Sequence, residues 1–303
     1  MKSGYLDQAM QLVFQELTGI IQENEFTEYS ARKIKDDKET QTIYRVFEGE
    51  KLSRLALEQY SIKSKMYGLV VNIYSKPGFG IPIFTFQLGG QIPDRIIFVL
   101  DIIPVCNKAK VNQLVNVLFK QECLKYENLG SNQEWLAEIT SPNMLVCQYK
   151  ACDPLKLIES LRNYLRFWRD NFYKPAIPLT DNDIKAESTE SLLHYKRVLH
   201  ANDSGFDIYL KNFGQAMVDV IAQAAFGGEP ALESTITASD PVTETTPGLS
   251  VESEGIKWTT EAMSFLEEAP GFVRSKIKEK AEAKAKEMGL HEITPDLIAS
   301  LRK

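Results

Sequence analysis

Residues 67–103, YGLVVNIYSKPGFGIPIFTFQLGGQIPDRIIFVLDII, alternate apolar runs with short turn signals. The Pro77–Gly80 segment, Pro-Gly-Phe-Gly, separates two runs that each have the length and β-branched content of a strand. Upstream, Gly49 marks another junction. Strands are predicted at 41–47, 52–60, 67–75, 81–89 and 95–103. Turns this short can join only antiparallel neighbours, so the pattern predicts a meander.

Helical periodicity flanks this region on both sides. Residues 5–22, 110–125, 154–172 and 206–226 carry apolar positions at helical spacing, and 144–149 reads as one further strand. Helices before, between and after a meander predict helical layers on both faces of one sheet. The expected fold class is therefore α/β, an α/β/α sandwich with a central antiparallel sheet.

The composition bounds the domain organisation. The 303 residues are 44% hydrophobic and 25% charged, which is typical of a globular protein of about two domains. Residues 229–255 carry six acids and no Lys or Arg, with few apolar residues, which predicts a flexible acidic linker. We therefore divide the chain into an α/β/α domain at 1–228, this linker at 229–255, and a small all-helical module at 256–303. Within that module, Thr294-Pro295 predicts a helix start.

The charge balance and the scattered Cys and His residues exclude several classes of site. The formal net charge is −6, so no basic surplus favours nucleic acid. The four Cys form no Cys-x-x-Cys pair and the three His do not cluster, so we expect free thiols and no metal site. The sequence also lacks a Gly-rich nucleotide-phosphate loop, an H-E-x-x-H motif and a G-x-S-x-G motif.

Hydropathy excludes a membrane-spanning segment. No run approaches the ~20 apolar residues that a bilayer requires, and residues 1–7 lack an apolar signal core. We therefore expect a cytoplasmic protein, with a peripheral position at a photosynthetic membrane left open.

The ordered motifs of residues 1–228 resemble the ferredoxin-dependent bilin reductases. The likeness rests on Leu57-Glu58, the hydrophobic strand from Tyr67 to Pro77, and Gly80-Ile81-Pro82-Ile83-Phe84. It continues with Leu88-Gly89-Gly90, Asp101-Ile102-Ile103-Pro104 and His200-Ala201-Asn202-Asp203. The resemblance implies an α/β/α sandwich that holds a pigment between the sheet and the C-terminal helices.

A second resemblance covers the C-terminal segment of about 48 residues. It rests on Trp258-Thr259-Thr260-Glu261-Ala262, on Ala269 to Arg274, and on Gly289 with Ile293-Thr294. This segment is similar to the small C-terminal module found in the larger catalytic component of the dark-operative protochlorophyllide reductase, which folds over a tetrapyrrole. Both resemblances therefore imply a tetrapyrrole ligand.

The first resemblance also implies a chemistry. Bilin reductases hold no redox cofactor; reduced ferredoxin delivers single electrons to the pigment, and acidic side chains supply protons. Glu58 and Asp203 match the two acids of that family. From the residues alone, Glu58 could equally be a solvated strand carboxylate that shares a face with Ala56 and Tyr60, opposite Leu55 and Leu57. Asp203 or Asn202 could cap the following helix.

Several positions depart from the family pattern. Val70 stands where the best-known members carry a catalytic His, Gln87 where they carry Asp, and Thr85 where they carry Gly. Gln87 could hydrogen-bond a pyrrole nitrogen or carbonyl but cannot act as an acid. The resemblance implies that Gln87, Asn202, Val70 and Thr85 line the pocket. Some branches of the family, including red chlorophyll catabolite reductase, work with a Glu and an Asp alone.

A basic stripe lies on the 154–172 helix. Arg162, Arg166 and Arg169 recur at helical spacing, with Leu161 and Leu165 directed toward the core. This stripe could receive acidic ferredoxin or pigment propionates, or it could be an ordinary solvated face.

Three functional hypotheses follow. The first is ferredoxin-dependent reduction of a tetrapyrrole with Glu58 and Asp203 as proton donors and the C-terminal module as a tethered lid. The second is a non-catalytic pigment-binding protein or an assembly factor for a photosystem or another pigment–protein complex of the thylakoid. The third is a scaffold without pigment. An empty cleft between the two acids would favour the enzyme, and a cleft filled by Val70, Phe84 or Phe86 would favour the scaffold.

Overall fold

The computed structural model describes residues 4–22, 25–91, 95–126, 134–149 and 154–227, with shorter pieces between 257 and 297. It divides the chain into two units, Met1–Ser234 and Thr235–Lys303. The acidic linker predicted at 229–255 lies outside the described residues, so its flexibility stays a prediction. Within the described ranges, no helix combines the length and hydrophobicity needed to cross a bilayer.

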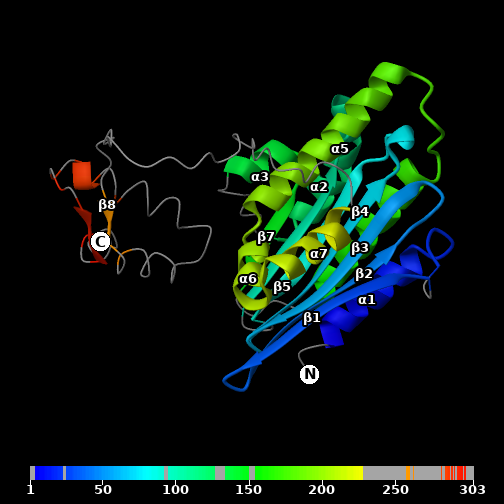
Figure 1. The fold of residues 1–303 in the computed structure, drawn as a ribbon. Helices are drawn as coiled ribbons and strands as arrows, with labels where there is room; N and C mark the ends of the chain where they lie inside the picture. The colour runs from blue at the N-terminus through cyan, green and yellow to red at the C-terminus, as the bar shows by residue number, and fades with distance from the viewer. Residues whose placement is uncertain are drawn as a thin grey trace, which may run out of the picture. The chain divides into compact units, whose positions relative to one another are not determined.

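Seven antiparallel strands form one sheet in the order of the chain, as the turn spacing predicts (Figure 1). Each strand hydrogen-bonds to the next, so the sheet is a simple meander. The strands are β1 Thr27–Lys35, β2 Lys38–Phe47, β3 Leu52–Ile62, β4 Met66–Ser75, β5 Ile83–Gln91, β6 Arg95–Ile103 and β7 Leu145–Tyr149. The strand β1 was not predicted individually, because it is an edge strand whose only buried side chain belongs to Ala31.

Two helical layers cover the sheet and confirm the α/β/α sandwich (Figure 1). One layer comprises α1 Gly4–Glu16, α2 Lys108–Cys123 and α4 Pro154–Trp168, which a π-helical turn continues over Arg169–Tyr173. The other comprises α3 Glu134–Ile139, α5 Asn182–Asn202, α6 Ser204–Phe213 and α7 Gln215–Phe226. A single turn of 3₁₀ helix, η1 Pro77–Phe79, joins β4 to β5.

Each helical layer has its own core. Leu55 and Leu57 pack under the α1, α2 and α4 layer, together with the fully buried Trp168, whose Nε1 donates to the Pro82 carbonyl at 2.8 Å. Tyr44, Tyr74 and aromatic side chains of α6 and α7 form the core on the other face. Alternation along each strand produces this division, because successive side chains point to opposite faces.

Three helix predictions need correction. The first helix ends at Glu16 rather than at residue 22, because Gly19 adopts a left-handed φ of 80°. The helix predicted at 206–226 is two helices, broken at Gly214 with φ 86° and ψ 168°. The long helix α5 was missed because its N-terminal half is mostly exposed and polar, although Asp181 caps it by accepting from the amides of Asp183 and Ile184.

The C-terminal unit adds a short strand pair to its predicted helical character. Strand β8, Lys257–Trp258, pairs in parallel with β9, Glu292–Ile293. Ala262, Ala281, Ala285 and Ile293 are fully buried, and Trp258 packs against them. The predicted helix start at Thr294-Pro295 is confirmed, since Pro295 is helical.

The glycines of β4 and β5 leave room for one aromatic ring. Gly68 pairs with Gly89, and a Cβ on either would overlap the side chain of Tyr60 on the neighbouring strand. We expect Gly68→Ala to lower the free energy of unfolding by about 1–3 kcal/mol, because the added methyl group overpacks the sheet face. Urea unfolding measures this change. Gly78→Ala is the matched control, since no atom lies within 4 Å of its added Cβ, and equal losses in both variants would contradict the prediction.

Candidate active site

Glu58 lies in the middle of the sheet on the face that α5, α6 and α7 cover. It pairs directly with Tyr44 on β2 and with Val70 on β4, and Val70 in turn pairs with Gln87 on β5. Directly paired side chains share a face, so these four residues form one row across the sheet. Leu55 and Leu57 point to the opposite core, as the alternation predicted.

Three hydroxyl groups hold the Glu58 carboxyl. Thr42 Oγ1 donates to Glu58 Oε1 at 2.7 Å, and the hydroxyl of Tyr209 on α6 donates to the same oxygen. Tyr44 supplies a further side-chain hydrogen bond. Glu58 is only 6% exposed, and this burial raises its pKa above the ordinary value while the three hydroxyls lower it. The carboxyl is therefore a buried acid, not the solvated strand carboxylate that was the alternative.

Asp203 is the second acid of this cluster. It caps α6 by accepting from the Gly205 amide at 2.8 Å, so the capping role expected from the sequence is confirmed. Burial raises its pKa, and its charge is near enough to Glu58 to raise the pKa of that carboxyl as well. The break between α5 and α6 thus brings the two acids to one side of the sheet.

Gln87 and Tyr60 extend the cluster along the sheet. The hydroxyl of Tyr60 hydrogen-bonds the side chain of Gln87, while burial raises the pKa of Tyr60 to about 12. Gln87 is therefore engaged by a protein group in this conformation. Val70 lies between Glu58 and Gln87 in the row and contributes only apolar surface.

A second polar row runs parallel to the first. Asn72, Thr85 and Asp101 are paired across β4, β5 and β6. Thr85 Oγ1 donates to Asn72 Oδ1 at 2.7 Å, and Thr85 also hydrogen-bonds Tyr195 of α5. Asp101 is fully buried and accepts from both the amide and the hydroxyl of Ser141, yet burial raises its pKa to about 7. The interface between the sheet and these helices is thus unusually rich in hydroxyl and carboxyl groups.

Asn202 does not join the cluster. Its side chain is exposed and donates from Nδ2 to the Val198 carbonyl of its own helix at 2.8 Å. The expectation that Asn202 lines the pocket beside Asp203 is therefore corrected: α5 continues through Asn202, and helical geometry turns this side chain to solvent.

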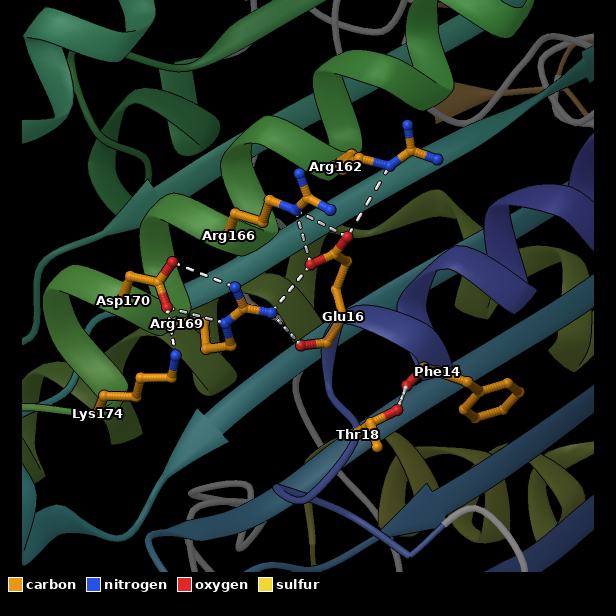
Figure 2. A network of polar contacts seen from close by, with 8 residues as sticks. All are labelled: Phe14, Glu16, Thr18, Arg162, Arg166, Arg169, Asp170 and Lys174. Atoms are coloured by element: carbon orange, nitrogen blue, oxygen red, sulfur yellow. Dashed lines mark hydrogen bonds and ion pairs between the residues drawn. The ribbon is translucent and has the colours of Figure 1, made fainter.

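The arginine stripe lies in the opposite helical layer, where its members converge on Glu16 of α1 (Figure 2). Arg166 Nε and Arg169 Nη1 each lie 2.9 Å from a Glu16 carboxylate oxygen, and Arg162 Nε lies 3.9 Å away. Arg169 also pairs with Asp170. The sheet separates the three arginines from Glu58, so the predicted contact with pigment propionates beside Glu58 is corrected. Their contact with ferredoxin stays a prediction.

The hydroxyl groups around Glu58 were missed by the sequence reasoning. Tyr60 carried a usable signal, because it shares a strand face with Glu58. Thr42 and Tyr44 needed the register between β2 and β3, and Tyr209 needed the position of α6 over the sheet. In the described part of the chain, no three His, Cys, Asp or Glu side chains gather as a metal site would require.

The architecture of residues 4–227 is that of the bilin reductases, a meander sheet with helices on both faces. Among solved structures, it resembles phytochromobilin synthase from tomato, whose crystal structure is a complex with biliverdin. The TM-score is 0.62 at 18% identity, and the match covers 74% of this chain and 83% of that chain. At this identity the likeness shows the fold, and it confirms the first resemblance at that level.

The C-terminal segment matches a different family. Residues 258–302 match the family model described as the proto-chlorophyllide reductase 57 kD subunit. The corresponding component of the light-independent protochlorophyllide reductase from Picosynechococcus sp. is 33% identical over 97 residues, which are 32% of this chain and 17% of that protein. Its counterpart from Mesostigma viride is 40% identical over 58 residues, 19% of this chain and 11% of that one. The chain thus spans less than a fifth of these relatives, and the second resemblance is confirmed for this segment.

Proposed function

We propose that this protein reduces a tetrapyrrole, either a bilin or a chlorophyll-type pigment, with reduced ferredoxin as the electron donor and Glu58 and Asp203 as proton donors. The observation that carries the proposal is the buried Glu58 carboxyl, which Thr42 and Tyr209 hold on the sheet face that carries Asp203. A solvated carboxylate would be deprotonated at neutral pH and could not act as an acid. Burial raises the pKa of both groups toward the range that general acid catalysis requires.

The proposed reaction balances with these groups. Reduction of one pigment double bond takes up two electrons and two protons. Ferredoxin would supply the electrons singly, so the protein itself would need no bound redox cofactor. The two carboxyls would supply one proton each and recover them from solvent after the product leaves.

The comparisons support a tetrapyrrole as the ligand class. The tomato enzyme of the same fold is complexed with biliverdin, and the relatives of the C-terminal segment are named for protochlorophyllide reduction. Two unrelated parts of one chain thus resemble proteins that handle linear and cyclic tetrapyrroles. In this proposal the first unit binds the pigment, and the C-terminal unit covers it or contacts a partner.

A second function is favoured by one specific observation. Val70 and Gln87 stand in the same row as Glu58 and neither can donate a proton as an acid, and Gln87 is bound to Tyr60. A protein that holds a tetrapyrrole, or assists assembly of a pigment–protein complex at a thylakoid membrane, would need the pocket without the full set of acids.

One titration separates the two functions. The purified protein is titrated with biliverdin, protochlorophyllide and chlorophyllide while the absorbance spectrum is recorded, and reduced ferredoxin is then added anaerobically. The reductase predicts saturable binding of at least one pigment, followed by a product spectrum. Binding with an unchanged pigment would favour the carrier, and the absence of binding would contradict both functions.

A further inference from the structure

The hydroxyl groups that hold Glu58 come from two different layers of the fold. Thr42 and Tyr44 belong to β2, where strand pairing with β3 fixes them beside Glu58. Tyr209 belongs to α6, in the helical layer. The three side chains are 0%, 6% and 5% exposed respectively, so these hydrogen bonds are made away from water. A buried carboxylate depends strongly on such donors, because no solvent replaces one that is lost.

The helix α6 is a separate segment of the helical layer. It begins after the break at Asp203, whose ψ is 112°, and ends at Gly214, whose φ is 86°. Near its end, the Asn212 carbonyl accepts from Lys33 Nζ of β1 at 2.8 Å. Tyr209 is thus the donor to Glu58 that a rearrangement of the helical layer would remove, while Thr42 and Tyr44 would stay.

Tyr209 also closes the route to Glu58. With its hydroxyl on Glu58 Oε1 and its ring stacked on Phe213 at 6.1 Å between centroids, it leaves both itself and the acid almost wholly buried. A pigment lying between sheet and helices could touch the Glu58 carboxyl only after Tyr209 has moved away.

We propose that Tyr209 is a positioning residue for Glu58, holding the carboxylate through its hydroxyl until an entering tetrapyrrole displaces it and Glu58 takes up a proton. The part that concerns the pigment rests on the proposed function; the part that concerns Tyr209 and Glu58 does not. The proton comes from solvent, and one is gained for each pigment bound. Pigment binding would thereby load the acid that the reduction consumes.

The groups that face Glu58 set the direction of this effect. They are Tyr44 on β2, Tyr60 on β3 itself, Tyr209 on α6 and Asp203 at the α6 cap. Burial and the charge of Asp203 raise the pKa of Glu58, and hydrogen bonds from Tyr209, Thr42 and Tyr44 lower it. The pKa values of Tyr44 and Tyr209 are raised by burial and by Glu58, so both remain protonated donors. Removal of one donor therefore favours protonated Glu58.

The test is the titration of Glu58 in the pigment-free protein. Infrared spectroscopy follows the C=O band of the protonated carboxyl against pH, and its loss in Glu58→Gln assigns it. We expect Tyr209→Phe to raise the proton affinity of Glu58 about tenfold or more, because one hydrogen bond to the charged form is lost. Tyr60→Phe is the matched control, since its hydroxyl binds Gln87 rather than Glu58. An unchanged midpoint in Tyr209→Phe would overturn the proposal.

A second measurement uses the unaltered chain and so does not depend on the folding of a variant. A pH dye in weak buffer records proton uptake while biliverdin or protochlorophyllide saturates the protein. We expect close to one proton per bound pigment above the Glu58 midpoint, and none in Glu58→Gln. Saturable binding without uptake would overturn the displacement step. Failure of every pigment to bind would contradict the proposed function, whereas the Tyr209→Phe midpoint would still decide the contact with Glu58.

Discussion

Glu58→Gln is expected to lower the rate of pigment reduction by about 100-fold or more, while pigment affinity changes only a few fold. The amide keeps the size of the carboxyl, and its oxygen can still accept from Thr42 and Tyr209. It cannot release a proton, and a positioned general acid contributes typically ~10²–10⁴-fold to a rate. Single-turnover kinetics with reduced ferredoxin measure the chemical step, and an absorbance titration measures the affinity.

Two further variants sharpen the result. Glu58→Asp keeps an acid at a shorter reach and should retain part of the rate that Glu58→Gln loses. Asp203→Asn should slow the second proton transfer, so that a one-electron-reduced or half-reduced pigment accumulates. An undiminished rate in Glu58→Gln would remove Glu58 from the mechanism, and weakened pigment binding alone would make it a binding residue.

The second large effect concerns Asp101 and the pH dependence of stability. Burial raises the pKa of Asp101 from 3.8 to about 7, in spite of its hydrogen bonds to Ser141. Because the folded pKa lies above the unfolded one, the folded state binds the proton more tightly. The contribution is fully present below about pH 4 and is lost as the pH rises through 7. A difference of about three pKa units corresponds to about 4 kcal/mol.

Asp101→Asn should remove this loss. The free energy of unfolding of the variant should fall by about 4 kcal/mol less than that of the unaltered protein between pH 4 and pH 8. Urea unfolding at several pH values measures the difference. Glu58 and Asp203 also have raised pKa values and contribute a fall in both proteins, so the comparison isolates Asp101. The control is Asp36→Asn in the exposed β1–β2 turn, and parallel curves for the unaltered protein and Asp101→Asn would contradict the prediction.

Local patterns in the chain were enough to predict the sheet and one face of the site. Alternation with short turns indicated an antiparallel meander, since strands joined by a few residues can only fold back on each other. The same alternation put Glu58 opposite Leu55 and Leu57, and the structure agrees. The position of Asp203 before Ser204-Gly205 indicated a helix cap, because capping is a local interaction between a side chain and the next amides.

Packing between distant segments determines which groups surround the acids and how the charges are paired. Tyr209 is 151 residues from Glu58 in sequence, and Glu16 is 150 residues from Arg166. Such contacts depend on how helices pack across a sheet, which hydrophobic periodicity leaves undetermined. The arginine stripe therefore looked free in the sequence but is paired with Glu16 in the fold. The buried hydroxyl cluster around Glu58 has no local signature for the same reason: its members come together only when strand register and helix packing are both fixed.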